Sequence, residues 1–141
     1  MTETPPKSAV TAPPVVAVGA VAVVDGALLL VRRARPPEAG SWSVPGGRVD
    51  AGETVRGAVE REVLEETGLT VGCGRFVGWA ERLGPDGHFV ILDFEVTGAG
   101  DGDPVPGSDA AAVAWVPLAE VATLALVEGL VDFLVGHGVL G

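Results

Sequence analysis

Apolar runs separated by short polar turns cover most of the chain, and their spacing predicts a mixed α/β protein. Val15–Val24 and Ala27–Arg33 flank Asp25-Gly26, a dipeptide typical of a tight β-hairpin. More strands are predicted where apolar runs lie between turns rich in Gly, Pro and Asp. These are a short strand around Trp42–Val44 and longer strands at Gly74–Leu83, His88–Thr97 and Ala112–Val116.

Helical spacing occurs in the middle and near the end of the chain. Thr54 is suited to cap a helix and Gly68 to end one, so a helix is predicted between them. A short helical turn is expected at Leu118–Val121, and a C-terminal helix at Leu124–Val135. This order predicts a mixed sheet with the middle helix on one face and the C-terminal helix on the other.

Length and composition predict one domain. Of the 141 residues, 48% are hydrophobic and 5% aromatic, so the core should consist mainly of Val, Leu and Ala. Residues 1–14, rich in Pro, Thr and Ser, are predicted to be a disordered tail, and residues 15–141 the domain. No apolar run reaches the ~20 residues that cross a bilayer. Val15–Val24 also lacks the basic leader of a signal peptide. A soluble, cytoplasmic protein without membrane contact is expected.

Charge narrows the choice of partners. The net charge of −10 argues against nucleic acid, whose backbone attracts clusters of Lys and Arg. The same field would repel a free pyrophosphate compound, so such a substrate would need bound metal and nearby arginines. Cys73 is the single cysteine, which excludes a disulfide framework and a cysteine-based metal site. The sequence leaves open whether the protein forms a homodimer.

The strongest chemical signal is a group of carboxylates in the middle helix. Glu62, Glu65 and Glu66 are spaced i, i+3, i+4, so they stand together on one side of the helix. Like charges held this closely favour a positive partner, and a hard divalent cation with oxygen ligands fits them. A solvated helix face is the alternative interpretation. The arc is predicted to look inward with Val55, Ala58 and Leu69, and the opposite side carries Gly57, Leu64 and Thr67.

These residues belong to a longer motif. Gly47 is followed after five residues by Glu53, and after seven more by Arg61-Glu62-Val63-x-Glu65-Glu66-x-Gly68-Leu69. Every defined position resembles the Nudix box. Softer similarity, from Val16 to about Leu118, resembles small bacterial Nudix hydrolases of the ADP-ribose pyrophosphatase type.

The resemblance implies a fold and a reaction. The fold would be the Nudix α/β/α sandwich. Glu62, Glu65 and Glu66 would bind one to three Mg²⁺ or Mn²⁺ ions with a carbonyl of Gly46 or Gly47, while Arg61 and Glu53 orient these ligands. The substrate would be a nucleoside diphosphate linked to another group. ADP-ribose, cleaved to AMP and ribose 5-phosphate, is the first expectation.

Substrate contacts are expected from arginines near the box. Arg32, Arg33 and Arg48 are the candidates for a phosphate contact, because the guanidinium fork suits phosphate oxygens. Packing and solubility are the alternative roles for them. Gly47 would contact the substrate through its backbone.

The catalytic base is where the chain departs from the family pattern. Many relatives carry a glutamate shortly before the counterpart of Trp115, and here Ala112 takes that place. Asp109 is nearby, so either it or Glu62 would serve as base. Two other functions stay open, a nucleoside triphosphate pyrophosphohydrolase and a Nudix-fold nucleotide-binding regulator without turnover. Pro85 resembles a marker of ADP-ribose hydrolases, but Pro-Asp-Gly is also an ordinary turn.

Overall fold

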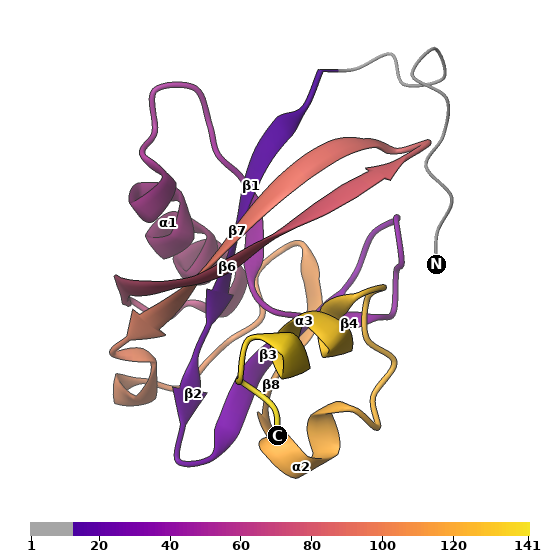
Figure 1. Ribbon diagram of the computed structural model, residues 1–141. Helices are drawn as coiled ribbons and strands as arrows, with labels where there is room; N and C mark the ends of the chain where they lie inside the picture. The colour runs from indigo at the N-terminus through magenta and orange to yellow at the C-terminus, as the bar shows by residue number, and fades with distance from the viewer. Residues whose placement is uncertain (1–12) are drawn as a thin grey trace.

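Two sheets form the frame of the protein (Figure 1). The computed structural model describes residues 13–141. The first sheet has the order β5-β1-β7-β6. Its strands are β1 (Val15–Val21), β5 (Gly46–Arg48), β6 (Gly72–Gly84) and β7 (Gly87–Thr97). The second sheet consists of β2 (Val23–Val24), β3 (Ala27–Arg33), β4 (Trp42–Ser43) and β8 (Ala110–Pro117). β1 and β7 pair in parallel and the other pairs are antiparallel, so the predicted mixed character is confirmed.

The chain passes from the first sheet to the second through a tight hairpin. Asp25 and Gly26 both have positive φ, 50° and 76°, which is the backbone that a two-residue type I′ turn needs. The predicted turn is therefore confirmed. The preceding strand is split, however, because β1 ends at Val21 and the short β2 pairs with β3 instead.

Helix α1 (Val55–Thr67) lies against the first sheet and has the predicted ends. The Thr54 side chain accepts a hydrogen bond from the Gly57 N–H at 3.0 Å, and Gly68 closes the helix with φ 74°. The Glu60 carboxylate accepts the Cys73 N–H at 2.8 Å, which ties α1 to the start of β6. These contacts fix the helix that carries the carboxylates.

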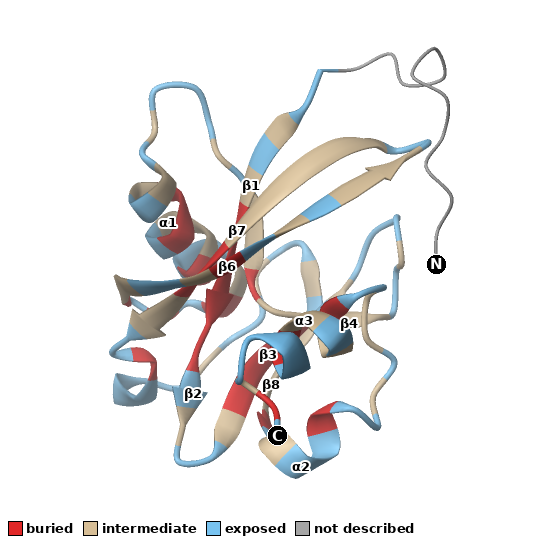
Figure 2. Cartoon of the chain, viewed as in Figure 1, coloured by how far each residue is buried: buried red, intermediate tan, exposed pale blue. Residues whose placement is uncertain are grey.

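Two apolar clusters separate the layers (Figure 2). Val59 and Val63 of α1 pack on Val18 and Phe94 of the first sheet. The second cluster joins the second sheet to α2 (Leu118–Val121) and α3 (Leu130–Gly136), with Leu134 fully buried. A 3₁₀ turn, η2 (Ala99–Asp101), follows β7. Helices thus lie on both sides of the strands, as predicted.

The C-terminal helix is shorter than the sequence predicts. The expected helix at Leu124–Val135 is wrong over its first half, since α3 begins at Leu130. The Trp42 backbone N–H donates to the Ala125 carbonyl, and the Trp42 carbonyl accepts from the Val127 N–H. Residues 125–127 therefore lie extended beside β4 and do not form a helix. Gly129, with φ 84°, then starts the helix. The predicted tail, 1–14, lies almost entirely outside the described residues.

A loop between β3 and β4 reaches across to the other layers. Glu38 in this loop has a positive φ of 60°. Its carboxylate accepts a hydrogen bond from Arg82 of β6 at 3.0 Å and another from the Glu128 N–H at 2.8 Å. The loop therefore joins the β6–β7 hairpin to the segment that leads into α3.

Candidate active site

Two carboxylates of α1 lie against the backbone of β5. The Gly46 N–H donates to Glu66 Oε2 at 3.2 Å. A Cβ added to Gly47 would stand 2.6 Å from the Glu62 carboxyl, so a side chain at this position would displace Glu62. Gly47 is therefore required for the close approach of α1 to β5, whereas a Cβ on Gly46 would stand 2.2 Å from the Val18 carbonyl oxygen of β1.

Arg61 is the hub that holds the acids. Its Nε donates to Glu53 Oε2 at 2.6 Å, and its Nη1 donates to Glu62 Oε1 at 2.8 Å. Nη1 also reaches Glu65 Oε2 at 3.1 Å, and Nη2 donates to the Arg48 carbonyl at 2.9 Å. One guanidinium thus connects Glu62 and Glu65 of the helix, Glu53 of the preceding loop and the Arg48 carbonyl of β5.

Burial changes the protonation of two acids. Burial raises the pKa of Glu66 to about 8, against the lowering effects of the Gly46 N–H and the Arg33 charge. Burial also raises the pKa of Glu62, although Arg61 opposes this shift. The pKa of Glu53 moves the other way, because Arg61 hydrogen-bonds to its charged form. Carboxyls that resist ionisation favour a cation that would compensate their charge.

The helix faces differ in part from the prediction. Ala58 is fully buried as expected. Thr67, predicted on the outer side, is also fully buried, and its hydroxyl donates to the Val63 carbonyl at 2.6 Å. The Glu65 side chain, predicted inward, is 58% exposed. The threonine satisfies its own hydroxyl within the helix, so its burial costs little.

The donor set suits a hard divalent ion. Among residues 13–141, no three acidic, His or Cys side chains converge as a preformed metal site. Glu62 and Glu65 share Arg61 Nη1 instead. All the donors are oxygens, and the half-buried carboxyls of Glu62 and Glu66 stand beside the glycine backbone. These residues therefore fit Mg²⁺ or Mn²⁺ by their chemistry.

The structure separates the candidate arginines. Of the three candidates, Arg33 is the one whose charge lowers the pKa of Glu66. Its Nε donates to the Pro37 carbonyl at 2.8 Å. The guanidinium of Arg32 lies over the Trp42 ring at 5.9 Å, and that of Arg48 over Phe89 at 5.5 Å. Arg33 is thus the best placed for a phosphate contact.

The two candidate bases lie in different surroundings. Asp109 is exposed and pairs with Arg35 Nε at 3.2 Å, although its charge still contributes to the raised pKa of Glu66. Ala112, on β8, pairs with Arg32 of β3. Glu62 is half-buried next to Gly47. The geometry brings Glu62 into the centre and leaves Asp109 at the margin.

Sequence reasoning missed two acids. Asp50 lies 3.6 Å from Arg61 Nη2, and its N–H donates to Glu53 Oε1 at 3.1 Å. Its place between Gly47 and Glu53 is the signal that could have revealed it. Asp93 is buried in the middle of β7, and the signal was a charged residue inside an apolar strand.

Comparison with known proteins identifies the family. Residues 13–134 match the NUDIX domain. This match and the site geometry place the chain in the Nudix family of pyrophosphohydrolases. No helix within residues 13–141 has the length and apolar character needed to cross a membrane.

Named relatives point to more than one substrate. The chain is 43% identical over 106 residues to a protein of Mycobacterium tuberculosis named putative 8-oxo-dGTP diphosphatase 2, covering 71% of this chain and 72% of that protein. It is 37% identical over 99 residues to a Methanocaldococcus jannaschii ADP-ribose pyrophosphatase, covering 69% of this chain and 58% of that protein. A crystal structure of a MutT Nudix hydrolase from Burkholderia pseudomallei superposes with TM-score 0.77 at 30% identity, covering 87% and 97% of the two chains.

Proposed function

We propose that this Nudix hydrolase cleaves the pyrophosphate linkage of a nucleotide in the presence of Mg²⁺ or Mn²⁺. The observation that carries the proposal is the placement of Glu66 against Gly46 and of Glu62 against Gly47, with Glu62 held by Arg61. Partly buried acids beside a glycine backbone suit a hard cation and the phosphate that it binds.

Glu62, Glu65, Glu66 and a carbonyl of Gly46 or Gly47 would hold the metal ions. A bound divalent ion supplies an acidic water and stabilises negative charge on phosphate oxygens. Arg61 and Glu53 keep the carboxylates in position, which is a positioning role, because arginine cannot ligate a cation. Arg33, close to Glu66, binds a phosphate oxygen of the substrate.

Glu62 is the proposed base that takes a proton from the attacking water. It is central and half-buried, whereas Asp109 is exposed and already paired with Arg35. Asp109 is the alternative base, and Ala112 offers no acid in its place. Substitution of each acid separates these alternatives.

A purine nucleoside triphosphate is the leading substrate, and ADP-ribose is the second. The M. tuberculosis relative carries the higher identity of the two, and its name specifies 8-oxo-dGTP. The M. jannaschii relative supports ADP-ribose. Pro85 adds little to the latter, because it lies in the turn between β6 and β7, where proline serves the turn itself.

Product analysis on a nucleotide panel tests the reaction. Purified protein would be incubated with Mg²⁺ and with dGTP, 8-oxo-dGTP, ATP or ADP-ribose, and the products separated by chromatography. Pyrophosphate plus a monophosphate supports the leading substrate class, and AMP plus ribose 5-phosphate supports the second. Binding without any turnover would overturn the proposal in favour of a nucleotide-binding regulator.

Matched variants make the panel specific. Glu66→Gln removes a buried acid of the site, and Glu120→Gln removes an exposed acid of α2. The first should abolish most turnover while the second retains it. Equal rates in both variants would show that the hydrolysis has another source.

A further inference from the structure

The loop between β3 and β4 encloses Arg33, the arginine proposed to contact a substrate phosphate. The Arg33 N–H donates to the Ser41 carbonyl at 2.9 Å, and the Arg33 carbonyl accepts the Gly40 N–H at 2.8 Å. The side chain is held by the loop as well, because its Nε donates to the Pro37 carbonyl at 2.8 Å. The backbone and the guanidinium of Arg33 are therefore both fixed by residues 37–41.

The Pro37 carbonyl sets the direction of the Arg33 guanidinium. Because a guanidinium is planar and rigid, a hydrogen bond to Nε also fixes the direction of its two Nη groups. The Arg33 charge acts on Glu66 of α1, whose pKa it lowers against the larger effect of burial. A displacement of the Pro37 carbonyl would therefore turn the Nη donors of Arg33 relative to the acids of the site.

Glu38, the residue after Pro37, connects this loop to two other parts of the chain. Its Oε2 accepts a hydrogen bond from Arg82 of β6 at 3.0 Å, and its Oε1 accepts the Glu128 N–H at 2.8 Å. The Glu38 side chain is 27% exposed and that of Arg82 is 41% exposed. An isolated surface ion pair contributes little to stability, but a carboxylate that uses both oxygens on separate segments can fix a loop.

The backbone of Glu38 supports a positioning role. Its φ of 60° lies in the left-handed region, which a residue with a side chain seldom adopts. Such a conformation persists where surrounding contacts hold it, and it is frequent at functional sites. The Glu38 carbonyl accepts the Ser41 N–H at 3.0 Å. The side-chain contacts of Glu38 therefore act together with this bond to hold a turn that its backbone disfavours.

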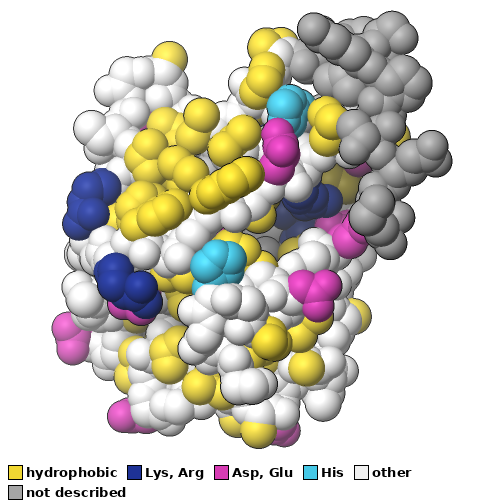
Figure 3. All heavy atoms as spheres, in the orientation of Figure 1, with side chains coloured by type: hydrophobic (Ala, Val, Ile, Leu, Met, Phe, Trp, Pro, Cys, Tyr) yellow, Lys and Arg dark blue, Asp and Glu magenta, His cyan; other side chains and the backbone are white. Residues whose placement is uncertain are grey.

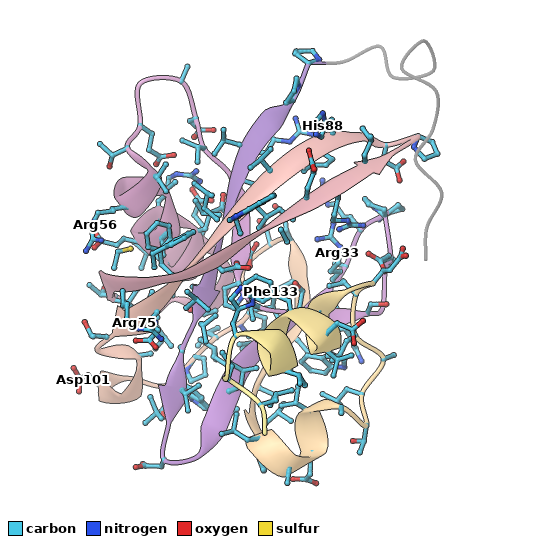
Figure 4. The ribbon with its side chains drawn as sticks, in the orientation of Figure 1. Arg33, Arg56, Arg75, His88, Asp101 and Phe133 are labelled. Atoms are coloured by element: carbon cyan, nitrogen blue, oxygen red, sulfur yellow. The ribbon has the colours of Figure 1, made fainter. Side chains whose placement is uncertain are left out.

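Glu38 joins the two sides of a recess in the surface. Figure 3 shows this recess between the β6–β7 hairpin and the part of the chain below it, with Lys or Arg atoms inside. In Figure 4, which has the same orientation, Arg33 lies between the β6 ribbon and α3. Glu38 contacts the upper side through Arg82 of β6 and the lower side through the Glu128 N–H, just before α3. The loop that holds Arg33 is thus anchored on both sides.

We propose that Glu38 is a positioning residue, which keeps the Arg33 guanidinium directed at the substrate phosphates by anchoring the loop that carries the Pro37 carbonyl. The inference rests on the proposed function, because it takes Arg33 as the phosphate contact. Glu38 itself is negatively charged and would repel a phosphate, so it contributes through geometry and not through its charge. These two effects have opposite signs, which makes the positioning role measurable.

Pyrophosphate binding measures this role without turnover. Calorimetric titration of inorganic pyrophosphate in the presence of Mn²⁺ should show that Glu38→Ala binds roughly tenfold more weakly than the wild type, the usual cost of losing a residue that orients a binding group. Loss of the charge alone would strengthen binding, since the variant is less negative. Unchanged or tighter binding by the variant would overturn the inference. Absence of binding by the wild type would instead overturn the proposed function, and the inference with it.

A double-mutant cycle shows whether Glu38 acts through Arg33. Arg33→Ala removes the group that Glu38 is proposed to position. In this background Glu38→Ala should change the affinity for pyrophosphate by less than about twofold, because nothing is left for it to direct. The same tenfold loss in both backgrounds would overturn the positioning role and leave Glu38 as a structural residue.

Two further variants control for charge and for folding. Glu95→Ala also removes an acid that pairs with an arginine of β6, Arg75, but it leaves the loop untouched, so its affinity should equal or slightly exceed that of the wild type. Glu38→Gln keeps an acceptor for the Glu128 N–H and loses the charge that faces Arg82, so it should show a smaller loss of the same sign. This variant replaces Glu38→Ala if thermal unfolding shows that the alanine variant does not fold. An equal loss in Glu95→Ala, or none in Glu38→Gln, would overturn the inference.

Discussion

The acids of α1 and the acid of β7 are buried in opposite ways. Arg61 contacts Glu53, Glu62 and Glu65 within 3.1 Å, and Glu66 receives the Gly46 N–H. In contrast, Oδ1 of Asp93 is buried beside Gly19 and has no hydrogen-bond partner within residues 13–141. The first group is prepared in advance by the chain itself. The second has a carboxyl oxygen without a partner, so the two regions differ in how the cost of burying an acid is compensated.

Removal of Glu66, an acid of α1 that the backbone holds in position, should have the largest effect on kcat. Glu66→Gln should lower kcat by roughly 10²-fold or more, because it removes charge from a site that activates water. A chelator should abolish turnover of the wild-type protein. Steady-state kinetics with and without added Mn²⁺ would check both results. Full activity in chelator would eliminate the metal-dependent mechanism.

Removal of the unpartnered acid should instead stabilise the fold at neutral pH. The folded pKa of Asp93, about 6, exceeds its ordinary value of 3.8. Folding therefore favours the protonated form, and its stability contribution is complete below pH 3.8 and lost as pH rises through 6. The difference corresponds to about 3 kcal/mol.

Asp93→Asn cannot ionise and should not show this loss. Urea unfolding at pH 4, 5, 6 and 7 would measure it as a growing advantage of the variant over the wild type. Glu95→Gln, at an exposed position, provides the baseline. A variant that is equally destabilised at every pH would contradict the expectation.

Loss of the Arg61 side chain should disturb the positions of the carboxylates more than it weakens metal binding. Arg61→Ala should reduce kcat by roughly tenfold or more, the usual cost of losing a group that orients metal ligands. Some Mn²⁺ binding should persist, since the carboxylates remain. Titration of Mn²⁺ followed by paramagnetic relaxation would show this. Complete loss of binding in a folded variant would assign Arg61 a larger role than positioning.

The smallest effect is expected at the margin of the site. Asp109→Asn should reduce kcat less than tenfold, because Asp109 is exposed and paired with Arg35. The pH profile of kcat should keep its shape. A drop of ~10²–10⁴, typical for loss of a general base, would move the base from Glu62 to Asp109.

Local signals predicted the parts of the structure that local chemistry controls. The Asp25-Gly26 turn, the Thr54 and Gly68 caps and the turn at Leu118–Val121 all depend on neighbouring residues, and the structure confirms them. The prediction of a C-terminal helix was wrong over residues 124–129. The backbone there hydrogen-bonds to Trp42, a residue distant in sequence that periodicity cannot reveal. Burial of Thr67 was missed for a related reason, since an internal hydroxyl bond makes a polar residue compatible with the core.

The candidate site likewise has parts that the sequence predicted and parts that it did not. The family resemblance implied that Glu62, Glu65 and Glu66 would share a metal site with a carbonyl of Gly46 or Gly47. The structure places Glu66 beside Gly46 and Glu62 beside Gly47. Which arginine lies nearest the acids could not be predicted, because Arg32 and Arg33 are adjacent in sequence but face opposite sides of β3. The surroundings of Asp93 could not be predicted either, because its neighbours Gly19 and Gly78 lie on other strands, far from it in the sequence.

The β6 strand has a consequence for handling the protein in solution. It is 13 residues long, lies at the edge of its sheet and carries the exposed ring of Trp79. A long edge strand is a template for pairing with other chains, although Arg75, Glu81 and Arg82 place charges along this one. Register shifts between Cys73 and Gly78 interrupt the regular backbone spacing along half of the strand. These irregularities bend the edge away from a regular template, so they oppose pairing with another chain.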